Sequence, residues 1–124
     1  DWYGSEFAKW SLELTGRMNE RGVPIGAGTD TPIGYALPGY SLHTELEFLV
    51  EAGLSPVEAL YAATIRPAEF FSLQDKMGTI EPNKVADMVL LDANPIEDIR
   101  NTRQINLVIS KGKVLFPKDF IDID

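Results

Sequence analysis

Residues 23–30 read Val23-Pro24-Ile25-Gly26-Ala27-Gly28-Thr29-Asp30, and this stretch decides the fold of the chain. Its apolar and small residues show no polar alternation, which is typical of a strand buried on both faces of a parallel sheet. Pro24 is tolerated at the start of such a strand. In a parallel α/β barrel, the residue just past the C-terminal end of a strand is where chemistry reaches the substrate. The stretch therefore predicts a barrel strand that presents Asp30 to an active site.

A helix is predicted before this strand and a long loop after it. Ser5 is the candidate N-cap, and the helix is expected to end near Gly22. Its apolar residues fall at helical intervals and are expected to pack onto a sheet: Phe7, Trp10, Leu14 and Met18. Residues 31–40 are rich in proline and glycine, so they form a loop long enough to cover a pocket.

Two further helices are predicted after the loop. The first begins at Ser41 and stops at Gly53, and its apolar stripe consists of Leu42, Leu46, Leu49 and Val50. The second begins after Ser55, because residues 55–58 combine an N-cap serine, a proline at the first helical position and a glutamate that can close a capping box. Pro67 interrupts this helix and begins a short helical piece that reaches about Leu73.

After Gly78 the pattern changes from helical to extended. A strand is predicted over residues 86–92. Two more strands, over residues 105–110 and 113–116, are joined by Lys111-Gly112 as a two-residue hairpin turn. We therefore divide the chain into a first part, a strand-rich part and an acidic tail: residues 1–77, 78–118 and 119–124.

Charge and composition exclude several classes of protein. The chain has 11 Lys+Arg against 19 Asp+Glu, a net charge of -8, which disfavours a nucleic-acid partner. It has no cysteine, so it has no disulfide and no thiolate ligand for zinc. No apolar stretch approaches the ~20 residues of a membrane span, so we expect a soluble protein without a membrane partner. The compartment stays open; we favour the cytoplasm, and a signal peptide ahead of Asp1 would lie outside this sequence.

The length of the chain is short for the predicted fold. A complete eightfold barrel needs roughly 250 residues, whereas this sequence has 124. It also begins with Asp1 rather than Met, and a helical pattern follows within a few positions. We therefore expect a C-terminal piece of a larger enzyme.

Several ordered motifs resemble the amidohydrolase superfamily, in its imidazolonepropionase- and dipeptidase-like branch. The resemblance covers almost the whole chain. Each motif alone is a weak signal, and only the complete set in this order is specific for the family. The motifs are Gly28-Thr29-Asp30, His43-Thr44-Glu45-Leu46, residues 49–60, Ala63-Thr64, residues 78–87, residues 90–95 and residues 108–112.

The resemblance implies an α/β fold, namely the C-terminal fragment of a metal-dependent (β/α)8 barrel, with the last strand and the helices after it. Residues 79–116 would be the C-terminal share of a small β-sandwich. Members of this branch hydrolyse C–N bonds in amides, cyclic amides or dipeptides with a divalent metal such as zinc. Their metal site also uses a His-X-His pair, a carboxylate or carboxylated Lys, and further His residues. This chain has a single His, and we expect no metal on the chain alone.

By resemblance, Asp30 is a metal ligand and the catalytic proton shuttle of the parent enzyme. A divalent metal makes hydroxide available at neutral pH, and a carboxylate beside that water can take its proton and hand it to the departing nitrogen. The competing interpretation is a turn residue, because an Asp before Thr-Pro often caps local backbone.

Other polar residues near the predicted site stay ambiguous. His43 lies in the first turn of its helix, where it could bind substrate or only cap and hydrogen-bond. Glu45 and Glu47 are assigned to a solvated or capping face, because acids in an early turn favour the helix dipole. Tyr35 and Tyr40 could line the substrate pocket or pack within the loop.

Two classes of function follow. In the first, the chain is a segment of a metal-dependent amidohydrolase whose substrate is a small amide or dipeptide, and the isolated chain is inactive. In the second, it is a non-catalytic oligomerising structural module. Unpaired strand edges and open apolar faces associate, so we expect a homo-oligomer or attachment to the remainder of the parent chain.

Overall fold

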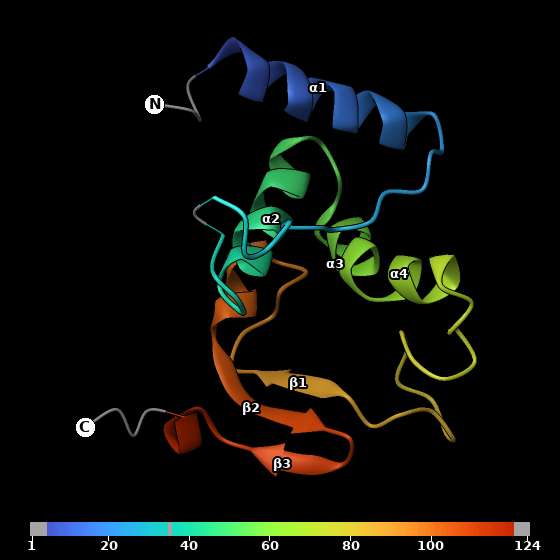
Figure 1. Cartoon of the computed structure of the whole chain (residues 1–124), viewed down its shortest axis with the longest axis vertical. Coiled ribbons are helices and arrows are strands. Elements are labelled where there is room, and N and C mark those ends of the chain that lie inside the picture. The colour runs from blue at the N-terminus through green and yellow to red at the C-terminus, as the bar shows by residue number, and fades with distance from the viewer. Residues whose placement is uncertain (1–4, 35, 121–124) are drawn as a thin grey trace.

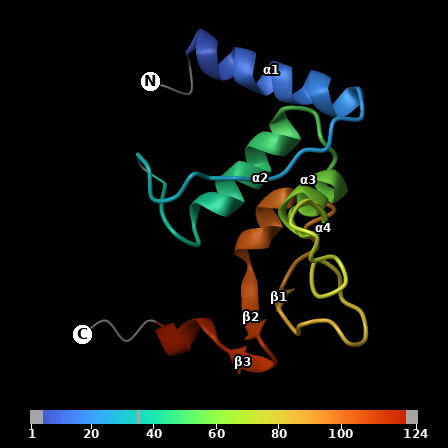
Figure 2. The same ribbon diagram turned by 45° about the vertical axis from the view of Figure 1, so that its right-hand side comes forward.

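The computed structural model describes residues 5–34 and 36–120 (Figure 1). Helix α1 lies at one end of the molecule and the sheet at the other, with α2 and α3 between them (Figures 1 and 2). Tyr35 and residues 121–124 of the predicted tail lie outside the described residues. The elements in chain order are α1 (Glu6–Glu20), α2 (Ser41–Glu51), α3 (Pro56–Ala63), α4 (Ile65–Phe70), β1 (Met88–Leu91), η2 (Ile99–Arg103), β2 (Ile105–Ser110), β3 (Lys113–Leu115) and η3 (Pro117–Phe120).

Two predicted helix starts are confirmed by their caps. The Ser5 side chain accepts a hydrogen bond from the Ala8 N–H at 3.2 Å. At α3, the Ser55 side chain accepts from the Glu58 N–H at 3.3 Å, and the Glu58 carboxylate accepts from the Ser55 N–H at 2.7 Å. These bonds form the predicted capping box and satisfy N–H groups that have no partner inside the helix.

The predicted apolar stripe of α1 has no sheet to cover among the described residues. Phe7 and Trp10 remain 61% and 55% exposed, while the buried residues of the helix are Ala8 and Gly16. Helix α1 lies on α2 rather than on a sheet, and the two helices are so close that a Cβ on Gly16 would overlap the Ala52 carbonyl oxygen. The small residues therefore face the neighbouring helix, and the large apolar side chains face outward.

Residues 23–30 run extended but do not form the predicted strand. A strand needs a neighbouring strand on its edge, and the sheet found among the described residues consists of β1, β2 and β3. The segment instead packs against the helices. The Ala27 N–H donates to the Ala62 carbonyl of α3 at 2.8 Å, and the side chains of Ile25 and Ala27 pack on the core.

A small core holds α2, α3 and η2 together. Its members are apolar residues with less than a tenth of their surface exposed: Leu46, Leu49, Leu54, Ala59, Ala62 and Ile99. Leu42, which belongs to the predicted stripe of α2, is 40% exposed and lies outside this cluster. Helix α4 begins at Ile65 and ends at Phe70, so it starts before Pro67 and stops short of the predicted end at Leu73.

The strand-rich region forms one antiparallel sheet in the order β1-β2-β3. Met88 pairs with Ile109, and Val108 pairs with Leu115 across the hairpin. The turn residues Lys111 and Gly112 have φ values of 49° and 78°, as a two-residue turn of this kind requires. The hairpin prediction is confirmed. The second sheet of the expected sandwich is not found among the described residues.

Candidate functional site

Asp30 stands at the end of the extended segment, with its side chain exposed. Its φ is 52°, a left-handed conformation that Asp adopts more easily than most residues. Its carbonyl accepts from the Ile33 N–H at 2.9 Å, and the hydroxyls of Thr29 and Thr31 lie 2.7 Å apart. The backbone therefore turns sharply at Asp30, and the carboxylate remains available to a ligand.

Helix α2 holds the segment just before Asp30. The Gly28 N–H donates to Oε1 of Glu45 at 3.3 Å. Glu45 is half-buried and lies in a groove of about 450 Å³ between α1 and α2. Burial raises the pKa of the Glu45 carboxyl, and the Gly28 N–H partly opposes that rise. The sequence predicts a solvated or capping face for Glu45; its carboxylate is instead half-buried and accepts a hydrogen bond from the segment 23–30.

His43 contacts η2 through its ring. Its Nδ1 lies 3.0 Å from Oγ1 of Thr102, whose hydroxyl also donates to the Ile99 carbonyl at 2.9 Å. Because the hydroxyl has one proton, both bonds form together only when His43 Nδ1 is the donor, which leaves Nε2 without a proton in the neutral ring. Burial lowers the pKa of His43, the Arg103 charge lowers it further, and Glu47 opposes this. Among the described residues, the hydrogen-bond partner of the His43 ring is Thr102 and not Asp30.

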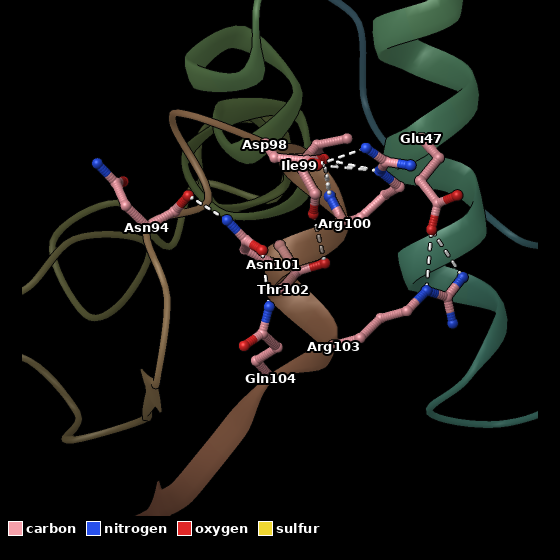
Figure 3. A network of polar contacts seen from close by, with 9 residues as sticks. All are labelled: Glu47, Asn94, Asp98, Ile99, Arg100, Asn101, Thr102, Arg103 and Gln104. Atoms are coloured by element: carbon pink, nitrogen blue, oxygen red, sulfur yellow. Dashed lines mark hydrogen bonds and ion pairs between the residues drawn. The ribbon is translucent and has the colours of Figure 1, made fainter.

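Arg103 joins η2 to α2 (Figure 3). Its Nε donates to Oε1 of Glu47 at 2.9 Å, and its Nη2 donates to Oγ1 of Thr44 at 3.0 Å. Its guanidinium lies 4.5 Å from the centre of the Tyr40 ring. Glu47 is therefore paired rather than solvated, and Tyr40 packs against this cation. The sequence pattern could not reveal the pair, because its partners are 56 positions apart.

Asp30 fits a divalent cation as one oxygen ligand. Within residues 5–34 and 36–120, no group of three or more His, Asp or Glu side chains could hold a metal ion. A catalytic zinc usually takes three protein ligands. The remaining ligands would therefore have to come from outside the described residues.

Comparison with known proteins shows similarity to amidohydrolases. The profile of the amidohydrolase family matches residues 12–115. Imidazolonepropionase from Thermoplasma acidophilum is 30% identical over 110 residues, which cover 82% of this chain and 25% of that protein. Ochratoxinase from Aspergillus niger is 36% identical over 99 residues, covering 77% of this chain and 20% of that protein.

A solved structure shares the arrangement of the elements. A Xaa-Pro dipeptidase with bound methionine in its active site matches with a TM-score of 0.77 and 31% identity, over 85% of this chain and 25% of that chain. The chain belongs to the amidohydrolase family. It spans between a fifth and a quarter of the length of these relatives.

No helix of residues 5–34 and 36–120 has both the length and the apolar character that crossing a membrane requires.

Proposed function

We propose that this chain is a segment of a metal-dependent amidohydrolase that hydrolyses C–N bonds in a small amide, cyclic amide or dipeptide. The observation that carries the proposal is the exposed carboxylate of Asp30, which stands at the end of the segment 23–30. This segment lies within residues 12–115, the part of the chain that matches the amidohydrolase family. The names of the similar proteins, an imidazolonepropionase and a Xaa-Pro dipeptidase, support this class of substrate.

In the proposed mechanism, Asp30 is both a metal ligand and the proton shuttle. A divalent metal such as zinc, when bound, supplies a polarised water and an electrophile for the scissile carbonyl. The Asp30 carboxylate accepts a proton from the attacking water and delivers it to the departing nitrogen. His43 is the candidate for contact with substrate, since its unprotonated Nε2 is an acceptor.

The proposed place of the chain in the fold follows from the same comparison. Residues 1–77 would be the closing part of a (β/α)8 barrel, in which the segment 23–30 lies beside strands outside this chain. The Ala27 and Gly28 N–H groups, which donate to Ala62 and Glu45, would not take part in that pairing. Residues 78–118 would be one share of a small β-sandwich. Two observations support this arrangement: among the described residues, the extended segment has no neighbouring strand, and the three-stranded sheet has no second sheet packed on it.

A hydrolysis assay tests the proposed function. The complete protein that contains this chain is given a panel of dipeptides, cyclic amides and anilides before and after dialysis against a chelator. We expect hydrolysis of at least one class, its loss on chelation and its return with zinc. Hydrolysis that survives complete metal removal contradicts the metal dependence, and no hydrolysis of any C–N bond contradicts the proposed activity.

A further inference from the structure

We propose that Glu45 is a positioning residue: from α2, its carboxylate holds the Gly28 N–H and thereby fixes the end of the segment on which Asp30 stands. This inference rests on the proposed function of Asp30.

Two consecutive N–H groups tether this segment to two different helices. The Ala27 N–H donates to the Ala62 carbonyl of α3 at 2.8 Å, and the Gly28 N–H donates to Oε1 of Glu45 at 3.3 Å. The acceptors belong to two different helices, α3 and α2, so both helices hold this part of the segment. The Glu45 bond is the later one and lies two residues before Asp30.

The surroundings of Glu45 shield its side chain partly from water. Its side chain forms part of the α1–α2 groove, whose other wall includes Ala8, Ser11 and Leu12. A carboxylate that is partly shielded from water makes a stronger hydrogen bond than one in bulk solvent. Leu49, one turn further along α2, lines the same groove, so Glu45 lies where the groove meets the apolar core.

The consequence for catalysis is geometric. Asp30 acts only when its oxygen lies within reach of the proton it transfers. A small displacement of a catalytic group costs up to about 100-fold in rate. Loss of the Glu45 bond should therefore lower kcat more than it raises KM.

Hydrogen exchange measured by mass spectrometry tests the contact in the complete protein. The variants are Glu45→Ala, which removes the acceptor, and Glu45→Gln, which retains an acceptor oxygen. Glu51→Ala is the matched control, because Glu51 is an exposed acid on the same helix. In Glu45→Ala we expect exchange in a peptide covering residues 24–31 to accelerate about tenfold, as for a lost hydrogen bond to a charged group. The peptide should exchange as in the unaltered protein for Glu45→Gln and Glu51→Ala.

The kinetic readout uses an amide substrate found for the unaltered protein. We expect kcat to fall roughly 10- to 100-fold in Glu45→Ala, with KM changed less than threefold, and to be largely restored in Glu45→Gln. Unchanged exchange in Glu45→Ala overturns the inference, and so does faster exchange without loss of kcat. If the unaltered protein hydrolyses no amide, the proposed function fails, and the positioning inference fails with it even where the exchange result verifies the contact.

Discussion

His43 is the single histidine of the chain, and its surroundings define its protonation. Burial and the Arg103 charge lower its pKa below the ordinary value. We expect nitrogen NMR of the imidazole to show titration below about 6.5 and the Nδ1–H tautomer at neutral pH. Because the unfolded chain then binds the proton more tightly, the stability that neutral His43 contributes above pH 6.5 is lost as the pH falls toward its folded pKa. A His43 that titrates above 6.5, or an Nε2–H tautomer, contradicts this arrangement.

For Glu45, the folded protein shifts the pKa upward, and stability depends on pH in the opposite direction. Burial raises its pKa in the folded protein, so the folded state binds the proton more tightly than the unfolded state. Stability therefore falls as the pH rises from the unfolded value of about 4.3 through the raised folded value. We expect Glu45→Gln to increase the free energy of unfolding at pH 7 relative to the unaltered protein and to make no difference below about pH 4. Denaturant titration at both pH values measures this, and a loss of stability at pH 7 would contradict it.

At the scale of elements, the contact between α1 and α2 depends on Gly16. A Cβ at this position would overlap the Ala52 carbonyl oxygen, which belongs to the backbone and cannot rotate away. We expect Gly16→Ala to destabilise the protein by about 1–3 kcal/mol, despite the better helix propensity of alanine. Lys9→Ala on the exposed side of the same helix should change the free energy of unfolding by less than about 0.5 kcal/mol. Equal effects of the two substitutions would show that α1 does not pack as described.

The contact between α2 and η2 depends on Arg103. We expect a double-mutant cycle of Arg103→Ala and Glu47→Ala to give a coupling free energy of about 1 kcal/mol, because this pair is only partly exposed. Arg100 is the control on the same element: it pairs with Asp98 at the surface, and its side chain is 72% exposed. Arg100→Ala is expected to cost less than about 0.5 kcal/mol. A coupling free energy near zero would contradict a stabilising ion pair between Arg103 of η2 and Glu47 of α2.

These elements also show which features of the fold could be predicted from the sequence. Helix starts at Ser5 and Ser55 and the hairpin turn at Gly112 were predictable, because caps and turns depend on a few adjacent residues. The face of α1 and the partners of Glu45 were not, because they depend on which element lies opposite. For residues 23–30, the apolar pattern indicated burial between strands, but the strands that would pair with them are not among the described residues.

At the scale of the whole molecule, large apolar side chains remain uncovered. Phe70 is 83% exposed and Ile80 is 81% exposed, and more than half of the surface of Phe7 and of Trp10 is exposed as well. Large exposed apolar side chains favour association. We expect a polypeptide of residues 1–124 alone to form dimers or larger assemblies in light scattering with size-exclusion chromatography. A monomer that persists at high concentration and unfolds cooperatively would contradict the view that this fold needs further surface to cover it.

The central claim is that the chain contributes Asp30 to a catalytic site whose other groups lie elsewhere. The most direct measurement is the turnover of the complete protein with Asp30→Asn, beside Asp75→Asn as a control on an exposed turn residue. We predict that Asp30→Asn loses on the order of 10²–10⁴ in kcat, because the amide cannot carry the proton, while circular dichroism is unchanged. Asp75→Asn should retain full turnover. Near-normal turnover of Asp30→Asn with metal bound would contradict the claim and leave Asp30 as a turn residue.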